Sequence, residues 1–133
     1  MNILSIGSKI TLRKISEEIV DKVESINFLD TTTNNFLNWG LSKTKKINYY
    51  SGDITKIDTL INAGLNDSDI IIVHSENDME SLFIAQKSKI NANSSIFVIL
   101  EDLSLAEIFE SFGFIIFDSH NLKITRLLNK LGN

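Results

Sequence analysis

The chain has 133 residues, of which 43% are hydrophobic and 23% charged, the length and composition of one ordinary globular domain. Its formal net charge of −4 argues against nucleic-acid binding, because that requires a basic surface. The complete absence of cysteine excludes disulfides, thiol catalysis and cysteine-ligated metal. It also fits a reducing compartment, so we expect a cytoplasmic protein.

The apolar runs are short, and the longest fall far below the roughly 20 residues that a membrane helix needs. The N-terminus has no basic region of the kind that begins a signal peptide. We therefore expect no direct membrane insertion, although a membrane protein can still be a partner. The densest basic stretch, Lys43, Lys45 and Lys46, is interpreted as a solvated loop.

The first half of the chain alternates short apolar strands with amphipathic stretches of helical length. One stretch places apolar residues at three- and four-residue spacing, which gives a helix one buried face. Another is a short, weaker helix that contains the single tryptophan. In chain order the predicted elements are the strand Asn2–Ile6, the helical stripe Leu12, Ile15, Ile19 and Val23, the strand Ile26–Asp30, the weak helix 34–41 and the strand 47–50.

The second half continues this alternation. Its first helix is expected to have Thr55 as N-cap and Gly64 as its stop, and the next takes Asn77 or Asp78 as its cap. In chain order the predicted elements are the helical stripe Ile57, Leu60 and Ile61, the strand 70–74, the stripe Leu82, Phe83, Gln86 and Ile90, the strand 96–100, the stripe Leu105, Ile108, Phe109 and Phe112, the strand 114–117 and a final helix over 121–131.

The predicted strands are apolar throughout, which is typical of a parallel sheet covered on both faces. Unbroken alternation with right-handed crossovers predicts an α/β fold, a Rossmann-like doubly wound parallel sheet of six strands between two layers of helices. No linker or repeat divides the sequence, so we expect a single domain over residues 1–133. In such folds ligands bind at the carboxyl ends of the first strands.

The turn after the first strand lacks the glycine-rich phosphate loop of dinucleotide-binding domains. That loop reads G-x-G-x-x-G, and its glycines admit a tight turn, close approach to pyrophosphate and close packing of helix on strand. Here only Gly7 is kept, while Lys9 and Leu12 stand at the second and third glycine positions. Lys9 either holds a single phosphate as a point charge or faces solvent beside a lost site. Leu12 is expected to push the first helix away from the sheet.

Asp30 ends the second predicted strand, 23 residues after Gly7. In dinucleotide-binding domains an acid near this position accepts hydrogen bonds from a ribose. An aspartate that caps the turn over residues 30–33 explains the same residue equally well. Both interpretations remain open from the sequence.

Five segments after residue 50 occur in a fixed order: G-D-I-T at 52–55, L-I-N-A-G-L at 60–65, D-S-D-I-I-I-V at 67–73, S-E-N-D at 75–78 and A-E-I-F-E-S-F-G-F at 106–114. Together they resemble the N-terminal domain of the regulators of potassium conductance, the TrkA-N or RCK-N type. The degenerate glycine loop departs from that family, as does Ile99, at a strand position where arginine is usual. The second, C-terminal lobe that often follows is either absent or lies beyond Asn133.

The resemblance implies a regulatory domain of potassium transport with a pocket shaped for a nucleotide. The ligand of this pocket is an adenine nucleotide or NAD, or the pocket binds no ligand. Partners would be a second copy, as in a homodimer, or a membrane transporter or channel. In this comparison Asp30 faces a ribose, and residues 52–54 border an adenine. Turn and capping roles are also open to these residues. The resemblance places around the pocket Gly7, Ser8, Lys9, Asp30, Thr31, Gly52, Asp53, Ile54, Ser75, Asn77 and Asp78.

The sequence shows no catalytic constellation, and we do not expect an enzyme. His74 ends a buried strand and His120 is expected to begin the final helix; two histidines with no cysteine and no tight carboxylate pair make a poor metal site. One alternative is an NAD-dependent oxidoreductase, which needs a pyrophosphate site and a substrate domain that the sequence does not show. The other is a ligand-free dimerisation or scaffolding domain, suggested by the lost glycines and by aromatic residues that a small core is not expected to bury completely: Phe36, Trp39, Phe114 and Phe117.

Overall fold

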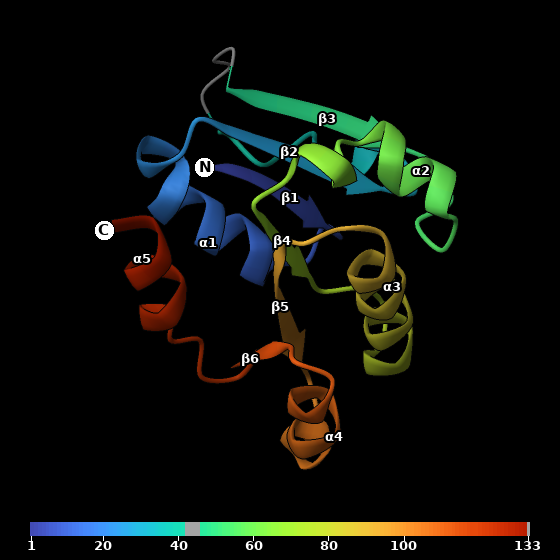
Figure 1. Ribbon diagram of the computed structural model, residues 1–133. Helices are drawn as coiled ribbons and strands as arrows, with labels where there is room; N and C mark the ends of the chain where they lie inside the picture. Colours follow the sequence, from blue (N-terminus) through green and yellow to red (C-terminus); the bar gives the residue numbers. More distant parts are fainter. Residues whose placement is uncertain (42–45, 133) are drawn as a thin grey trace.

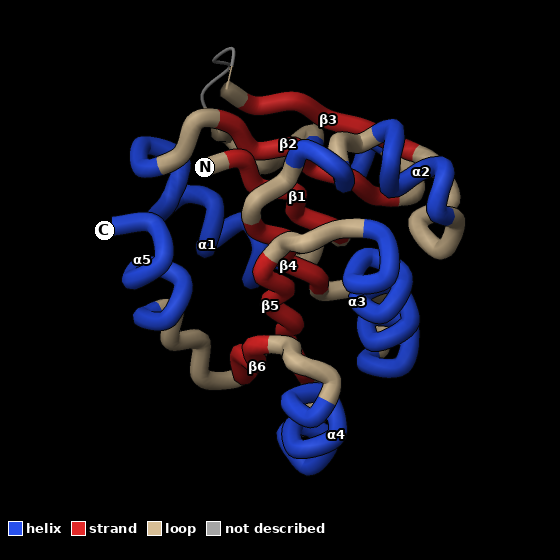
Figure 2. Tube along the Cα trace, in the orientation of Figure 1, coloured by secondary structure: helices blue, strands red, loops and turns tan. Residues whose placement is uncertain are grey.

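The computed structural model describes residues 1–41 and 46–132, which form six strands and five α-helices (Figure 1, Figure 2). The strands are β1 Asn2–Ile6, β2 Ser25–Asp30, β3 Ile47–Ser51, β4 Ile70–Val73, β5 Ser95–Leu100 and β6 Ile115–Asp118. The helices are α1 Ile10–Ile19, α2 Ile57–Asn62, α3 Asp78–Asn91, α4 Ala106–Ser111 and α5 Thr125–Gly132.

All six strands are parallel and lie in the order β3-β2-β1-β4-β5-β6. The chain builds the sheet outward from β1 in one direction and then from β4 in the other. This is the doubly wound arrangement that the sequence predicts, and the prediction is confirmed. The reversal between β1 and β4 opens a crevice at the carboxyl ends of these two strands, because the connections after them leave on opposite sides.

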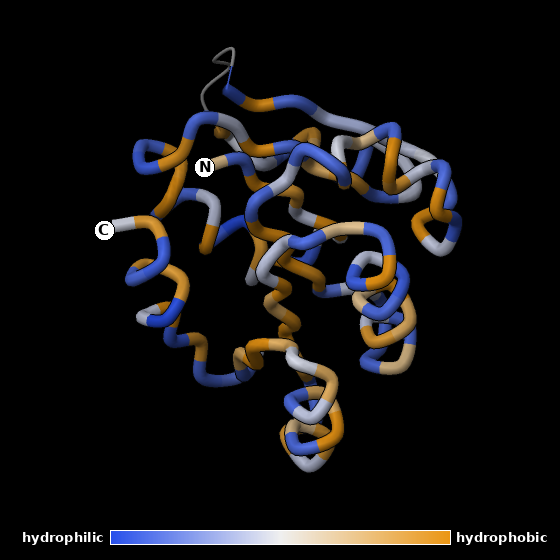
Figure 3. The backbone as a smooth tube through the Cα atoms, in the orientation of Figure 1, coloured by the Kyte–Doolittle hydropathy of each residue, from blue (hydrophilic) through white to orange (hydrophobic). Residues whose placement is uncertain are grey.

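Two apolar cores hold the helices against the sheet, one on each face. Successive strand residues point to opposite faces, so Ile3 of β1 joins the core beneath α1 and α5, whereas Leu4 joins the core beneath α2, α3 and α4. Figure 3 shows hydrophobic residues along the central strands, whereas hydrophobic and hydrophilic residues alternate along the helices. No helix in the described part of the chain combines the length and the apolar character needed to cross a membrane.

Several predicted boundaries are wrong. The final helix begins at Thr125, and His120 lies in the turn after β6 rather than at a helix start. Thr55 does not cap α2; its N–H and hydroxyl donate to Asp53, and the N-cap position falls at Lys56. The weak helix expected over 34–41 is only a 3₁₀ turn at Thr33–Phe36. Most of the basic stretch, residues 43 and 45, lies outside the described residues.

The aromatic residues that a small core was not expected to hold are all buried. Phe36 and Trp39 pack edge to face, with ring centroids 4.9 Å apart, and both contact Phe28 on β2. Phe114 and Phe117 are buried at the other end of the sheet, one in each core. The 3₁₀ turn after β2 therefore serves to seat an aromatic cluster over one edge of the sheet.

We expect Phe36→Ala to lower the free energy of unfolding by about 3–5 kcal/mol, because it removes a buried ring and leaves a cavity among its aromatic neighbours. Chemical denaturation monitored by Trp39 fluorescence measures the change. Leu37→Ala is the matched control, since the neighbouring side chain is 76% exposed and its truncation should cost less than about 0.5 kcal/mol. Equal losses for the two variants would contradict the packing described.

Candidate ligand-binding site

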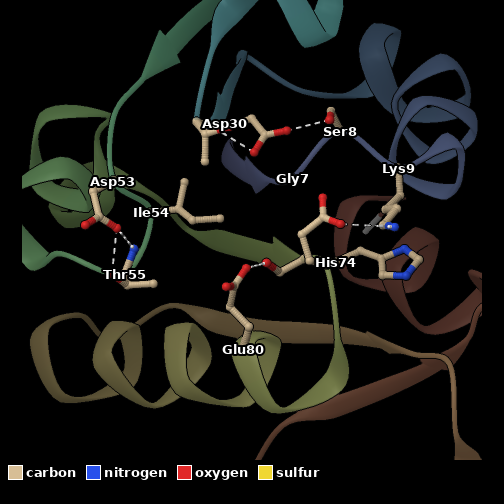
Figure 4. A pocket seen from close by; sticks show the side chains of 12 residues that line it. Gly7, Ser8, Lys9, Asp30, Asp53, Ile54, Thr55, His74 and Glu80 are labelled. Atoms are coloured by element: carbon tan, nitrogen blue, oxygen red, sulfur yellow. Dashed lines mark hydrogen bonds and ion pairs between the residues drawn. The ribbon is translucent and has the colours of Figure 1, made fainter.

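A cavity of about 200 Å³ lies at the carboxyl ends of the central strands, where the strand order reverses (Figure 4). Loops after β1, β2, β3 and β4 and the first turn of α3 form its walls. This volume is below the roughly 300–1,000 Å³ of pockets that enclose most of a drug-sized ligand. The cavity is therefore large enough to enclose only a part of a dinucleotide.

Most of the residues that the sequence places around a pocket do line this cavity. They come from four separate loops, up to 68 residues apart in the chain, and parallel strand ends bring them together. The predicted residues that line it are Gly7, Ser8, Lys9, Asp30, Thr31, Asp53, Ile54 and Ser75.

Three predicted residues do not line the cavity and have other roles. Gly52 approaches α2, where an added Cβ would lie 2.8 Å from the Thr59 side chain. Asn77 caps α3 by accepting a hydrogen bond from the Glu80 N–H at 2.9 Å. Asp78 accepts from the backbone N–H groups of residues 101 and 102, so it ties the start of α3 to the loop after β5.

Sequence reasoning missed Thr55, His74, Glu76 and Glu80, which also line the cavity. His74 and Glu76 follow β4 directly, just as Gly7 and Lys9 follow β1, so their position at a strand end was the available signal. Glu80 stands three residues after the N-cap Asn77, a spacing that marks the first turn of a helix.

The turn after β1 keeps its one glycine for a packing reason. Gly7 has φ +114°, and a Cβ there would lie 2.1 Å from the backbone oxygen of His74. Lys9 adopts an extended conformation and caps no helix N–H with its side chain; its Nζ lies 3.9 Å from a carboxylate oxygen of Glu76. Leu12 is buried in the core that α1 shares with the sheet, so its side chain packs between helix and sheet.

Asp30 is buried and its carboxylate is held by three donors. The hydroxyl of Ser8 and the amide of Asn35, at 2.9 Å, donate to one oxygen, and the Thr31 N–H donates to the other at 2.7 Å. Asp30 thus caps its own turn and also faces the cavity (Figure 4). The two interpretations left open by the sequence are therefore compatible.

Two more carboxylates are fixed at the cavity wall. Asp53 accepts hydrogen bonds from the N–H and the hydroxyl of Thr55, and these bonds hold the pKa of Asp53 below its ordinary value. Glu80 accepts a hydrogen bond from the Ser75 hydroxyl. Between them the apolar side chain of Ile54 faces the cavity (Figure 4).

His74 connects the cavity wall to the loop after β5, in the half of the sheet formed by β4, β5 and β6. Its Nε2 lies 2.7 Å from Glu101, and its Nδ1 is hydrogen-bonded to the Thr11 hydroxyl. Burial lowers the pKa of His74, and the hydrogen bond to Glu101 offsets this only in part. The neutral ring therefore carries its proton on Nε2, because a carboxylate can only accept, and Thr11 donates to Nδ1. Glu101 also accepts from Ser119 in the turn after β6.

The doubly wound parallel sheet defines a Rossmann-like domain, and its cavity lies at the switch point of the strand order. The model of the TrkA-N domain family matches residues 10–120. The chain belongs to the TrkA-N domain family, as the resemblance in its sequence predicts. No curated protein sequence matches the chain.

Solved structures share the fold at low sequence identity. The TrkA-N domain of the inner membrane protein ybaL from Escherichia coli has a TM-score of 0.76 and 12% identity, covering 99% of this chain and 96% of that one. The Kef C-terminal domain of Shewanella denitrificans, in AMP-bound form, has a TM-score of 0.68 and 16% identity, covering 100% and 83%. The NAD-bound GsuK channel has a TM-score of 0.71 and 14% identity over 97% of this chain, which spans only 22% of that channel chain.

We expect Gly7→Ala to lower the free energy of unfolding by about 2–4 kcal/mol, through backbone strain and overlap with the His74 carbonyl. Gly40→Ala is the control, because φ there is also positive, at +66°, but an added Cβ meets nothing within 4 Å. The control should cost about 1–2 kcal/mol of conformational strain alone. Urea denaturation of both variants measures the difference, and a Gly7 variant as stable as the Gly40 variant would refute the close contact.

The free energy of unfolding should fall as the pH is lowered below about 6.5, the ordinary pKa of histidine. The unfolded chain then binds a proton that buried His74 resists, because its folded-state pKa is lowered. His74→Gln should flatten this dependence between pH 7.5 and pH 5, measured by urea denaturation at each pH. His120→Gln, at a side chain 72% exposed and 3.5 Å from the other oxygen of Glu101, is the comparison and should change the dependence less than His74→Gln does.

Proposed function

We propose that this chain is a non-catalytic regulatory domain of a potassium-transport system and that its cavity binds an adenine-containing ligand. Membership of the TrkA-N family supports the regulatory role. Structural similarity to the GsuK channel and to a Kef domain points in the same direction. The site of action would be the cytoplasm, with a second copy of the chain or a membrane transporter or channel as partner.

The observation that carries the ligand part is the position of the cavity. It lies at the switch point of the sheet, where open α/β folds bind their ligands. Asp30 at the end of β2 offers acceptor oxygens to ribose hydroxyls, and Ile54 offers an apolar wall to a base. No side chain caps α1, and the Leu12 and Arg13 N–H groups already donate to the Lys9 carbonyl, so only the N–H groups before them could donate to an acceptor on the ligand.

The turn after β1 would bind phosphate more weakly than a glycine-rich loop does. A glycine loop presents bare backbone to a pyrophosphate, whereas here the side chain of Lys9 occupies the wall and is paired with Glu76. This disfavours an NAD-dependent oxidoreductase. The ligand-free scaffolding alternative loses part of its motivation, because the aromatic residues that suggested it are buried in the two cores.

Regulation would follow if ligand binding were coupled to the arrangement of the domain and its partner. A ligand shifts the balance between two arrangements of the domain and its partner only if it binds one of them more tightly. The cavity is built from loops that belong to both halves of the sheet, so an occupied cavity would favour one relative position of those loops.

Isothermal titration of the chain with adenosine, AMP and NAD⁺ tests the ligand part. We expect at least one of them to bind, and Thr31→Trp to abolish that binding by filling the mouth of the cavity. Thr31 is exposed, so the variant should remain folded. Glu107→Trp adds the same bulk on exposed α4, outside the cavity, and should bind as the natural chain does. Absence of heat with all three ligands would overturn the proposal.

A further inference from the structure

The cavity wall is strongly acidic. Four carboxylate residues line it, namely Asp30, Asp53, Glu76 and Glu80, and the single cationic side chain among its described lining residues is Lys9. His74 does not add a second positive charge at neutral pH, because its pKa is lowered by burial. The amino end of α1 contributes the equivalent of about half a positive charge. Lys56 and Lys87 lie near Asp53 without lining the cavity, so the negative charge is concentrated at Asp30, Glu76 and Glu80.

The one lysine already has an anionic neighbour. Its Nζ lies 3.9 Å from Glu76, a pair whose side chains are 40% and 83% exposed. An exposed pair of this kind is weak, so a phosphate could displace Glu76 from Lys9. The displaced carboxylate would nevertheless stay at the cavity mouth and repel that phosphate.

The other carboxylates cannot turn away easily, since hydrogen bonds fix them. Asp30 is held by Ser8, Asn35 and the Thr31 N–H, and Glu80 by Ser75. Ionised carboxylates only accept hydrogen bonds, so a matching ligand must bring donors such as hydroxyl or amino groups. A ligand with a phosphate brings acceptors and negative charge instead.

We infer that the cavity prefers an unphosphorylated nucleoside to its phosphate esters and that Glu76 is the residue that sets this preference. The inference rests on the proposed function, since it specifies the chemical class of the ligand for the same cavity. Glu76 acts by neutralising Lys9 and by opposing any anion that approaches it. The preference should therefore weaken as salt rises, because both effects act between partly exposed charges.

The test is isothermal titration of adenosine, AMP and ADP into the natural chain, Glu76→Gln and Glu107→Gln, at low and at high salt. We expect the natural chain to bind adenosine more tightly than AMP, and AMP more tightly than ADP. Glu76→Gln should strengthen AMP binding about tenfold relative to adenosine binding, the size of effect that one unscreened charge near a surface can have. Glu107→Gln makes the same change in net charge on α4 and should alter neither.

Tighter binding of AMP than of adenosine by the natural chain would overturn the inference and leave the proposed ligand site standing. Equal gains in AMP affinity for the two glutamate variants would overturn the role of Glu76, because overall charge would then explain the effect. Absence of binding by every ligand to all three proteins would overturn the proposed ligand site and this inference with it. Thermal melting of each variant shows that it is folded.

Discussion

The close approach of the β1–α1 turn to the end of β4 shapes the whole candidate site. Gly7 faces the backbone carbonyl of His74 so closely that any Cβ would overlap with it. This contact sets Ser8 and Lys9 on one side of the crevice and Ser75 and Glu76 on the other. The cavity exists at this point because two neighbouring parallel strands send their chains in opposite directions.

The same contact explains why one glycine of the phosphate loop pattern is present while the other two are not. Only at position 7 does the backbone of another strand leave no room for a side chain. At position 12 the side chain turns into the core, where leucine adds buried apolar surface and does not oppose the packing of α1. At position 9 the side chain reaches Glu76. The fold therefore tolerates both replacements, and their consequences fall on the chemistry of the cavity.

Polar contacts extend from the cavity wall to the far half of the sheet. His74 bridges Thr11 of α1 and Glu101 after β5, and Glu101 in turn contacts Ser119 after β6. Asp78 binds the same loop from the start of α3. These bonds give the carboxyl edge of the sheet a continuous polar network above two apolar cores, with burial keeping His74 neutral within it.

The order of strands and helices, the doubly wound sheet and the family all follow from the sequence, because apolar runs with β-α alternation have few other ways to bury their surface. Most residues of the candidate site follow too, since they stand just after predicted strands. Local sequence could not show that Gly52, Asn77 and Asp78 turn to other partners, or that a 3₁₀ turn seats Trp39 in the core.

Only the tertiary structure decided the charge of the cavity. Asp30, Asp53 and the neighbours Glu76 and Glu80 lie in three segments far apart in the chain, and nothing in their spacing shows that they line one cavity together with Lys9. The sequence determined which backbone could form, because hydrophobic pattern and turn residues act locally. It did not determine which side chains meet, because distances between groups far apart in the chain depend on how the strands are ordered and how closely their ends approach.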